Sequence, residues 1–165
     1  MGIAPALAML LLRESSQRPF AGSILTLGRQ DIYFTYAQLA EMADQAGVRL
    51  KPSIACELSP KPEFASRSCI SDRTFFGALG FDDVRSLDYS QYEGADYCLD
   101  LNTCDLPAQL SNAFDVVFDG GTIEHVFHIP NTLKNIHRVL KVRGLVIHAS
   151  PSSNHIDHGF YMFSP

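Results

Sequence analysis

The chain has 165 residues, a length typical of one folded domain, and its 46% hydrophobic and 19% charged residues exclude a disordered protein. A net charge of -5 argues against nucleic acid as a main partner, because nucleic-acid binders concentrate Lys and Arg on one face. The cysteines Cys56, Cys69, Cys98 and Cys104 form no CxxC pair. We therefore expect the cysteines to be reduced, structural thiols, with Cys98 in a buried strand. The protein itself is expected to be soluble and cytoplasmic.

An apolar segment over residues 3–12 opens the sequence. No Lys or Arg precedes it and no small-residue cleavage pattern follows it, so it does not have the form of a signal peptide. It is also shorter than the roughly 20 residues that a membrane span requires. We predict that residues 1–22 form a helix and lead-in packed on the domain, with partner binding as the alternative, and we expect no membrane association.

The next elements alternate between strand and helix patterns. Residues 23–28 form a short apolar run that ends in glycine, as in a buried parallel strand. Thr35 and Gln38 have the spacing of a capping box, and helical periodicity follows as far as Gly47. Residues 48–70 contain three prolines and no sustained period, which predicts a long surface excursion.

The second half of the chain repeats this alternation. Ser71 is predicted to cap a short helix, followed by strands at 84–88 and 95–100 that both end in Asp. A fourth strand is expected at 114–119, then a helix from Pro130 that ends at Gly144. The fifth strand is predicted at 145–149.

Alternating strands and helices predict an α/β fold with a doubly wound, mostly parallel sheet of about five strands, Rossmann-like in type. We expect a single domain over residues 1–165. Within it, residues 23–151 would form the cofactor-binding core, and residues 152–165 a tail over the ligand side.

Polar residues and a glycine follow the predicted strands, where such sheets bind ligands. These residues are Gly28, Asp88, Asp100 and Asp119. The preference of Asp for turns could explain any one carboxylate, but three at one edge favour a binding site.

Two stretches carry a resemblance to a known family. The sequence FDVVFDGGTIEHVFHIPNTLKNIHRVLKVRGLVIHASP at 114–151 resembles the fourth strand, following helix and fifth strand of class I S-adenosylmethionine-dependent methyltransferases of small-molecule type. The sequence SLDYSQYEGADYCLDLNTCDLP at 86–107 is similar to the family's second and third strands. The resemblance covers about residues 23–151.

The resemblance implies S-adenosylmethionine as the cofactor. Asp88 would accept hydrogen bonds from the ribose hydroxyls, Tyr89 would lie against the adenine, and Asp100 with Leu101 would meet the adenine edge. The cofactor residues implied at the first and fourth strands are Gly28, Arg29, Gln30, Asp119 and Gly120.

The first strand departs from the family pattern. Where the family has GxGxG, this chain has TLGRQDIYFT, with Gly28 alone. Glycines there allow the backbone to approach the cofactor closely. Arg29 and Gln30 could supply side-chain contacts instead, but Arg29 is bulky, and a solvated turn residue is the more ordinary interpretation of it. The family's KPGG turn is also altered, at 141–144, which we expect to affect only an exposed corner.

Glu124 and His125 are the candidate catalytic residues, because they follow the fourth strand, where the family often places the group that accepts a proton. Histidine titrates near pH 6.5 and can act as a base at neutral pH. A capping or packing role is the alternative. The tail adds His155, Asp157 and His158, which lack any established zinc spacing. We therefore predict no metal site and favour acceptor binding or loop hydrogen bonds for them.

The leading functional prediction is methyl transfer from S-adenosylmethionine to a small molecule. The alternatives are a degenerate cofactor-binding domain without turnover and a non-enzymatic interaction module that uses the N-terminal helix. The family's C-terminal antiparallel strands are not recognisable, so 145–149 is predicted to be an edge strand. A second copy would cover that edge in a homodimer, or the protein is a shortened version of a longer one.

Overall fold

A computed structural model describes residues 2–52, 55–152 and 157–163. The chain divides into two compact units. Unit 1 joins Ser23–Arg29 to Arg85–Pro165, and unit 2 joins Gly2–Gly22 to Gln30–Val84. The prediction of a single domain over the whole chain stays a prediction.

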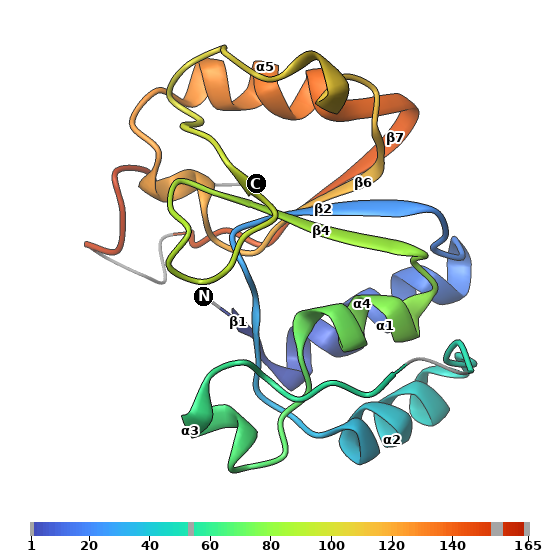
Figure 1. Cartoon of the computed structure of the whole chain (residues 1–165). Coiled ribbons are helices and arrows are strands. Elements are labelled where there is room, and N and C mark those ends of the chain that lie inside the picture. The colour runs from blue at the N-terminus through green and yellow to red at the C-terminus, as the bar shows by residue number, and fades with distance from the viewer. Residues whose placement is uncertain (1, 53–54, 153–156, 164–165) are drawn as a thin grey trace. The chain divides into compact units, whose positions relative to one another are not determined.

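The main sheet has five parallel strands and confirms the predicted fold class (Figure 1). Its strand order is β5-β4-β2-β6-β7. In chain order the strands are β2 (Ser23–Leu27), β4 (Asp83–Asp88), β5 (Tyr97–Cys98), β6 (Phe114–Asp119) and β7 (Leu140–His148).

The two central strands form because their side chains are apolar on both faces, as buried parallel strands require. Leu25 of β2 pairs with Val117 of β6, and both are fully buried. Helix α5 (Ile129–Val139) leads into β7 (Figure 1) and contributes Ile136 and Val139 to the same core cluster. Burial of this cluster holds the carboxyl ends of the strands in register.

The prediction that Gly144 ends this helix is wrong. The helix ends at Val139, because Leu140 is extended and pairs with Phe114 as the first residue of β7. The last carbonyl groups of the helix accept hydrogen bonds from residues 112 and 113 instead of being capped by a glycine. Gly144 lies inside β7 at an irregularity of the ladder, where a Cβ would come within 2.9 Å of the Lys141 carbonyl oxygen.

Unit 2 contains most of the helices. They are α1 (Pro5–Gln17), α2 (Tyr36–Ala46), α3 (Pro62–Ala65) and α4 (Asp72–Leu79), with a small parallel sheet of β1 (Gly2–Ile3) and β3 (Asp31–Ile32). The capping box of Thr35 and Gln38 is present at the start of α2, and the Ser71 side chain caps α4. Helix α1 buries Leu11 and Leu12 and packs against α2.

The predicted excursion over 48–70 is more ordered than its composition indicates. It contains α3 and is tied down by single bridges that pair Leu58 with Ile70 and Cys69 with Thr35. Two short 3-10 turns in unit 1, η1 (Ala108–Leu110) and η2 (Ile123–His125), complete the elements.

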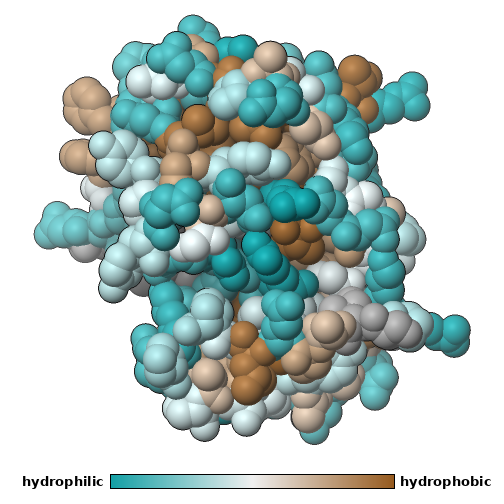
Figure 2. Space-filling model, in the orientation of Figure 1, coloured by the Kyte–Doolittle hydropathy of each residue, from teal (hydrophilic) through white to brown (hydrophobic). Residues whose placement is uncertain are grey.

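The described surface is mixed in character. On the face drawn in Figure 2, hydrophobic side chains are interspersed with hydrophilic ones. No described helix is long and apolar enough to cross a membrane.

All four cysteines are unpaired. The prediction that Cys98 is buried is wrong: it is exposed, because β5 is a two-residue strand at the edge of the sheet.

Candidate functional site

A pocket of about 310 Å³ lies in unit 1, at the carboxyl ends of β4 and β5 and the turn that follows β6. Ligands of open α/β sheets bind at this position because the loops diverge there. We call it the strand-end pocket. Its lining residues are Leu87, Asp88, Tyr89, Leu99, Asp100, Leu101, Asn102, Thr122, His125 and Val126.

The pocket brings together five residues that the sequence singled out. Asp88, Tyr89, Asp100 and Leu101 were predicted to bind a cofactor, and His125 was predicted to act in catalysis. Sequence reasoning missed the polar lining residues Asn102 and Thr122. The sequence feature that could have identified them is their position two or three residues after a predicted strand-end Asp. In the structure the backbone N–H of each donates a hydrogen bond to that Asp.

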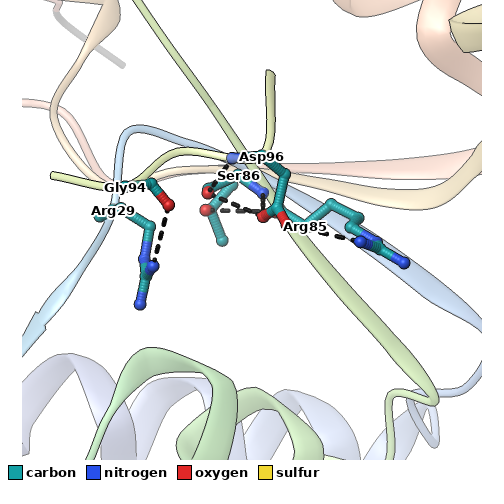
Figure 3. A network of polar contacts seen from close by, with 6 residues as sticks. Arg29, Arg85, Ser86, Gly94 and Asp96 are labelled. Carbon is teal, nitrogen blue, oxygen red and sulfur yellow. Dashed lines mark hydrogen bonds and ion pairs between the residues drawn. The ribbon is translucent and has the colours of Figure 1, made fainter. Parts of the chain in front are cut away.

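The loop after β4, which carries Tyr89, is attached to its own strand. Asp96 accepts hydrogen bonds from the backbone N–H (2.9 Å) and hydroxyl (3.0 Å) of Ser86 and pairs with Arg85 (Figure 3). Asp88 itself accepts a hydrogen bond from the Ser90 N–H at 3.1 Å. Asp88 and the exposed Tyr89, which are neighbours in the chain, both line the pocket.

The loop after β5 is anchored to the start of α5. Asp100 accepts hydrogen bonds from the backbone N–H and the side-chain amide of Asn102, at 2.9 and 2.8 Å. Asn102 in turn accepts hydrogen bonds from the His128 N–H and the Asn131 side chain. This chain of bonds connects the Asp100 side of the pocket to the start of α5.

Asp119 has a supporting role in the described geometry. It is fully buried, and its oxygens accept hydrogen bonds from the backbone N–H groups of Thr122 and Ile123 and the hydroxyl of Ser150, and pair with His148 Nδ1 at 3.0 Å. Burial alone would raise the pKa of Asp119, but these hydrogen bonds outweigh it, so the pKa lies below its usual value. Asp119 and the buried Gly120 shape the turn beside the pocket, and cofactor contact by them stays a prediction.

The two candidate catalytic residues lie in the turn η2. The His125 side chain is 46% exposed and faces the strand-end pocket, whereas the Glu124 side chain is fully buried. Burial raises the pKa of Glu124, and the charge of Asp119 acts in the same direction. His158, from the tail, also lies beside Glu124, with Nε2 at 3.7 Å from Glu Oε1.

The three residues predicted to bind the cofactor in the first-strand loop do not line the strand-end pocket, and each makes a different contact. Gly28 adopts a left-handed φ of 73° and donates its N–H to the Leu87 carbonyl at 2.7 Å. The Arg29 guanidinium donates to the Gly94 carbonyl at 3.3 Å (Figure 3). Gln30 belongs to unit 2, where its N–H donates to Asp72 at 3.2 Å. His155 lies outside the described residues.

A parallel α/β sheet with a partly apolar pocket at the carboxyl ends of its strands has the architecture in which open α/β proteins bind their ligands. Residues 77–148 match the family model described as a methyltransferase domain, a family of class I S-adenosylmethionine-dependent methyltransferases. All ten residues of the strand-end pocket fall within the matched segment, and the divergent first strand falls outside it. No curated protein and no solved structure gives a significant match.

Proposed function

We propose that the protein binds S-adenosylmethionine in the strand-end pocket and transfers its methyl group to a small-molecule acceptor. The observation that supports this most is the composition of the pocket. A carboxylate (Asp88), an aromatic ring (Tyr89) and an apolar side chain (Leu101) meet within the segment that matches the methyltransferase family.

These residues suit the adenosine part of the cofactor. The Asp88 carboxylate can accept hydrogen bonds from both hydroxyls of a ribose. The Tyr89 side chain, 77% exposed, is available to cover a purine face, and the buried Leu101 offers an apolar contact. The volume of about 310 Å³ is at the lower end of ligand pockets and matches part of the cofactor rather than all of it.

When bound, S-adenosylmethionine supplies an electrophilic methyl group on its sulfonium. The chain's contribution would be to align an acceptor for in-line attack, which is worth several kcal/mol in a well-oriented site. His125 is the pocket residue placed to receive the acceptor's proton. A cytoplasmic location is part of the proposal, because the cysteines are unpaired.

A degenerate, cofactor-binding domain without turnover is the second candidate, and the first-strand loop favours it. This loop has one glycine where the family has three, and the neighbouring Arg29 side chain is bonded to the loop at Gly94. The methionine end of the cofactor would have fewer backbone donors there than in the family pattern. Binding with no turnover in an acceptor screen would select this candidate.

Isothermal titration of the full chain with S-adenosylmethionine and S-adenosylhomocysteine tests the proposal. We expect both to bind, with micromolar affinity. If neither binds at millimolar concentration, the proposal fails and the interaction module built on α1 becomes the better explanation.

A further inference from the structure

Three side chains that commonly bind metal ions meet beside the strand-end pocket. They are Glu124 and His125, from the turn η2, and His158, from the tail. Glu124 Oε1 lies 3.9 Å from Nε2 of His125 and 3.7 Å from Nε2 of His158. The three ligand atoms all lie within 4.8 Å of one another.

The carboxylate at the centre of this cluster is unsatisfied. Glu124 is 0% exposed, and neither oxygen accepts a hydrogen bond of acceptable geometry from the described residues. A buried carboxylate without a hydrogen-bond partner is costly, and such groups in folded proteins are generally paired or bound to metal ions. The two imidazoles are the neighbours toward which Glu124 Oε1 is directed. A cation held between them would remove the cost.

The tail is fitted closely to η2, which places His158. The Phe160 N–H donates to the Glu124 carbonyl at 2.7 Å, and the Tyr161 hydroxyl donates to the Phe127 carbonyl at 2.6 Å. A Cβ on Gly159 would lie 2.6 Å from the Glu124 carbonyl oxygen, so the approach requires glycine. His158 therefore reaches Glu124 through specific backbone contacts.

We propose that Glu124, His125 and His158 bind a divalent transition-metal ion, with Zn²⁺ as the ion that their donor atoms match best. Two imidazole nitrogens and one carboxylate form the ligand set of many catalytic zinc sites, which keep another position open. Zinc bonds of about 2.0–2.2 Å in a tetrahedral arrangement separate two ligand atoms by about 3.3–3.5 Å. The observed 3.7 and 3.9 Å are somewhat longer, and the three ligand atoms lie within 4.8 Å of one another, so side-chain rotations would close the site on an ion.

The open position would face the strand-end pocket, because His125 lines that pocket and its side chain is 46% exposed. The His158 side chain is 39% exposed, which leaves the cluster accessible to an ion. An oxygen or nitrogen of a bound small molecule could occupy the remaining position. The site itself does not depend on the proposed methyl transfer. An ion on His125 Nε2 would prevent that nitrogen from accepting a proton, so the proton-accepting role of His125 applies to the metal-free chain.

Titration of the chelator-treated 165-residue chain with Zn²⁺, without any cofactor, tests the proposal. We expect one ion per chain with micromolar or tighter affinity. E124Q keeps the side-chain shape and removes the charge, and H158A removes an exposed side chain, so both variants should fold. Each should weaken Zn²⁺ binding at least tenfold. H137A, an exposed histidine on α5, is the matched control and should leave the affinity unchanged.

Substitution with Co²⁺ provides a second readout, because cobalt bound by two imidazoles and a carboxylate absorbs visible light in a way that the aqueous ion does not. That absorption should be lost in E124Q and H158A and kept in H137A. Absence of Zn²⁺ binding would overturn the proposal, as would equal affinity in all four proteins. Because no cofactor is present, either failure leaves the cofactor proposal intact.

Discussion

Asp88 is the residue on which cofactor recognition most depends in the proposed function. In D88A, S-adenosylhomocysteine binding should weaken by about 1.5–3 kcal/mol, because a charge-assisted hydrogen bond to a ribose hydroxyl is lost. Isothermal titration measures the loss. D105A removes an exposed carboxylate that does not line the pocket and should bind like the unmodified chain. Unchanged affinity in a folded D88A protein would contradict the placement of the ribose.

His125 is expected to matter for turnover rather than for cofactor binding. In H125A, we expect turnover to fall roughly 10²-fold or more, as when a general base is removed, with S-adenosylmethionine affinity nearly intact. The assay is release of S-adenosylhomocysteine with an acceptor found by screening. H137A again provides the control. Full activity in H125A would assign proton removal to His158, His155 or the acceptor itself.

Asp119 links folding stability to pH. Its folded-state pKa lies below the ordinary value, so its contribution to stability is present above about pH 4 and is lost as the pH falls through the folded-state pKa. D119N should lower the free energy of unfolding at pH 7 by about 1–3 kcal/mol. Urea unfolding between pH 2.5 and 7 should show a shallower acid loss for D119N than for the unmodified chain. Parallel curves would mean that other carboxylates carry the pH dependence.

At the scale of elements, the tail and the turn η2 should behave as one structural unit. In G159A, the new Cβ would overlap the Glu124 carbonyl, so we expect the Phe160 amide to exchange with deuterium at least tenfold faster. Far-UV circular dichroism should remain unchanged, because the five strands do not involve this contact. The variant Y161F, which removes only the hydroxyl bond to Phe127, should have a smaller effect on the same amide. Equal exchange in G159A and the unmodified chain would contradict the close fit.

The elements that could be predicted from the sequence are those defined by contacts between residues close together in the chain. The capping residues Thr35 and Ser71 define their helices through bonds to residues three positions later, so the pattern is readable from the chain alone. The end of α5 could not be read in this way. It depends on the pairing of Leu140 with Phe114, a contact between strands distant in sequence.

The same distinction applies to the candidate site. Asp88 and Asp100 were predictable because strand ends in a parallel sheet share one edge, and the resemblance to the methyltransferase family added Tyr89 and Leu101. The approach of His158 to Glu124 was not, because it depends on the path of the tail and on the backbone contact at Gly159. The spacing of the tail residues along the sequence therefore indicated no metal site. The proposed site depends instead on the proximity of Glu124, His125 and His158 in three dimensions.

At the scale of the whole molecule, the exposed edge of the main sheet is the feature that most affects association. Among the described strands, β7 ends the sheet, and its stretch from Leu145 to Ile147 is apolar. Lys141 and Arg143 protect only the beginning of the strand, where the ladder is irregular.

We expect this edge to pair with a second copy about a two-fold axis, because unpaired amides and carbonyls beside apolar side chains favour strand addition. Light scattering at micromolar concentration should give twice the 18.2 kDa of one chain, and dilution should lower the mass toward that of a single chain. Hydrogen exchange of the amides at 145–147 should quicken on dilution, whereas those of the central strand β2 should not change. A mass of one chain at every concentration, with 145–147 equally protected throughout, would exclude the dimer and show that β7 is stable as a free edge.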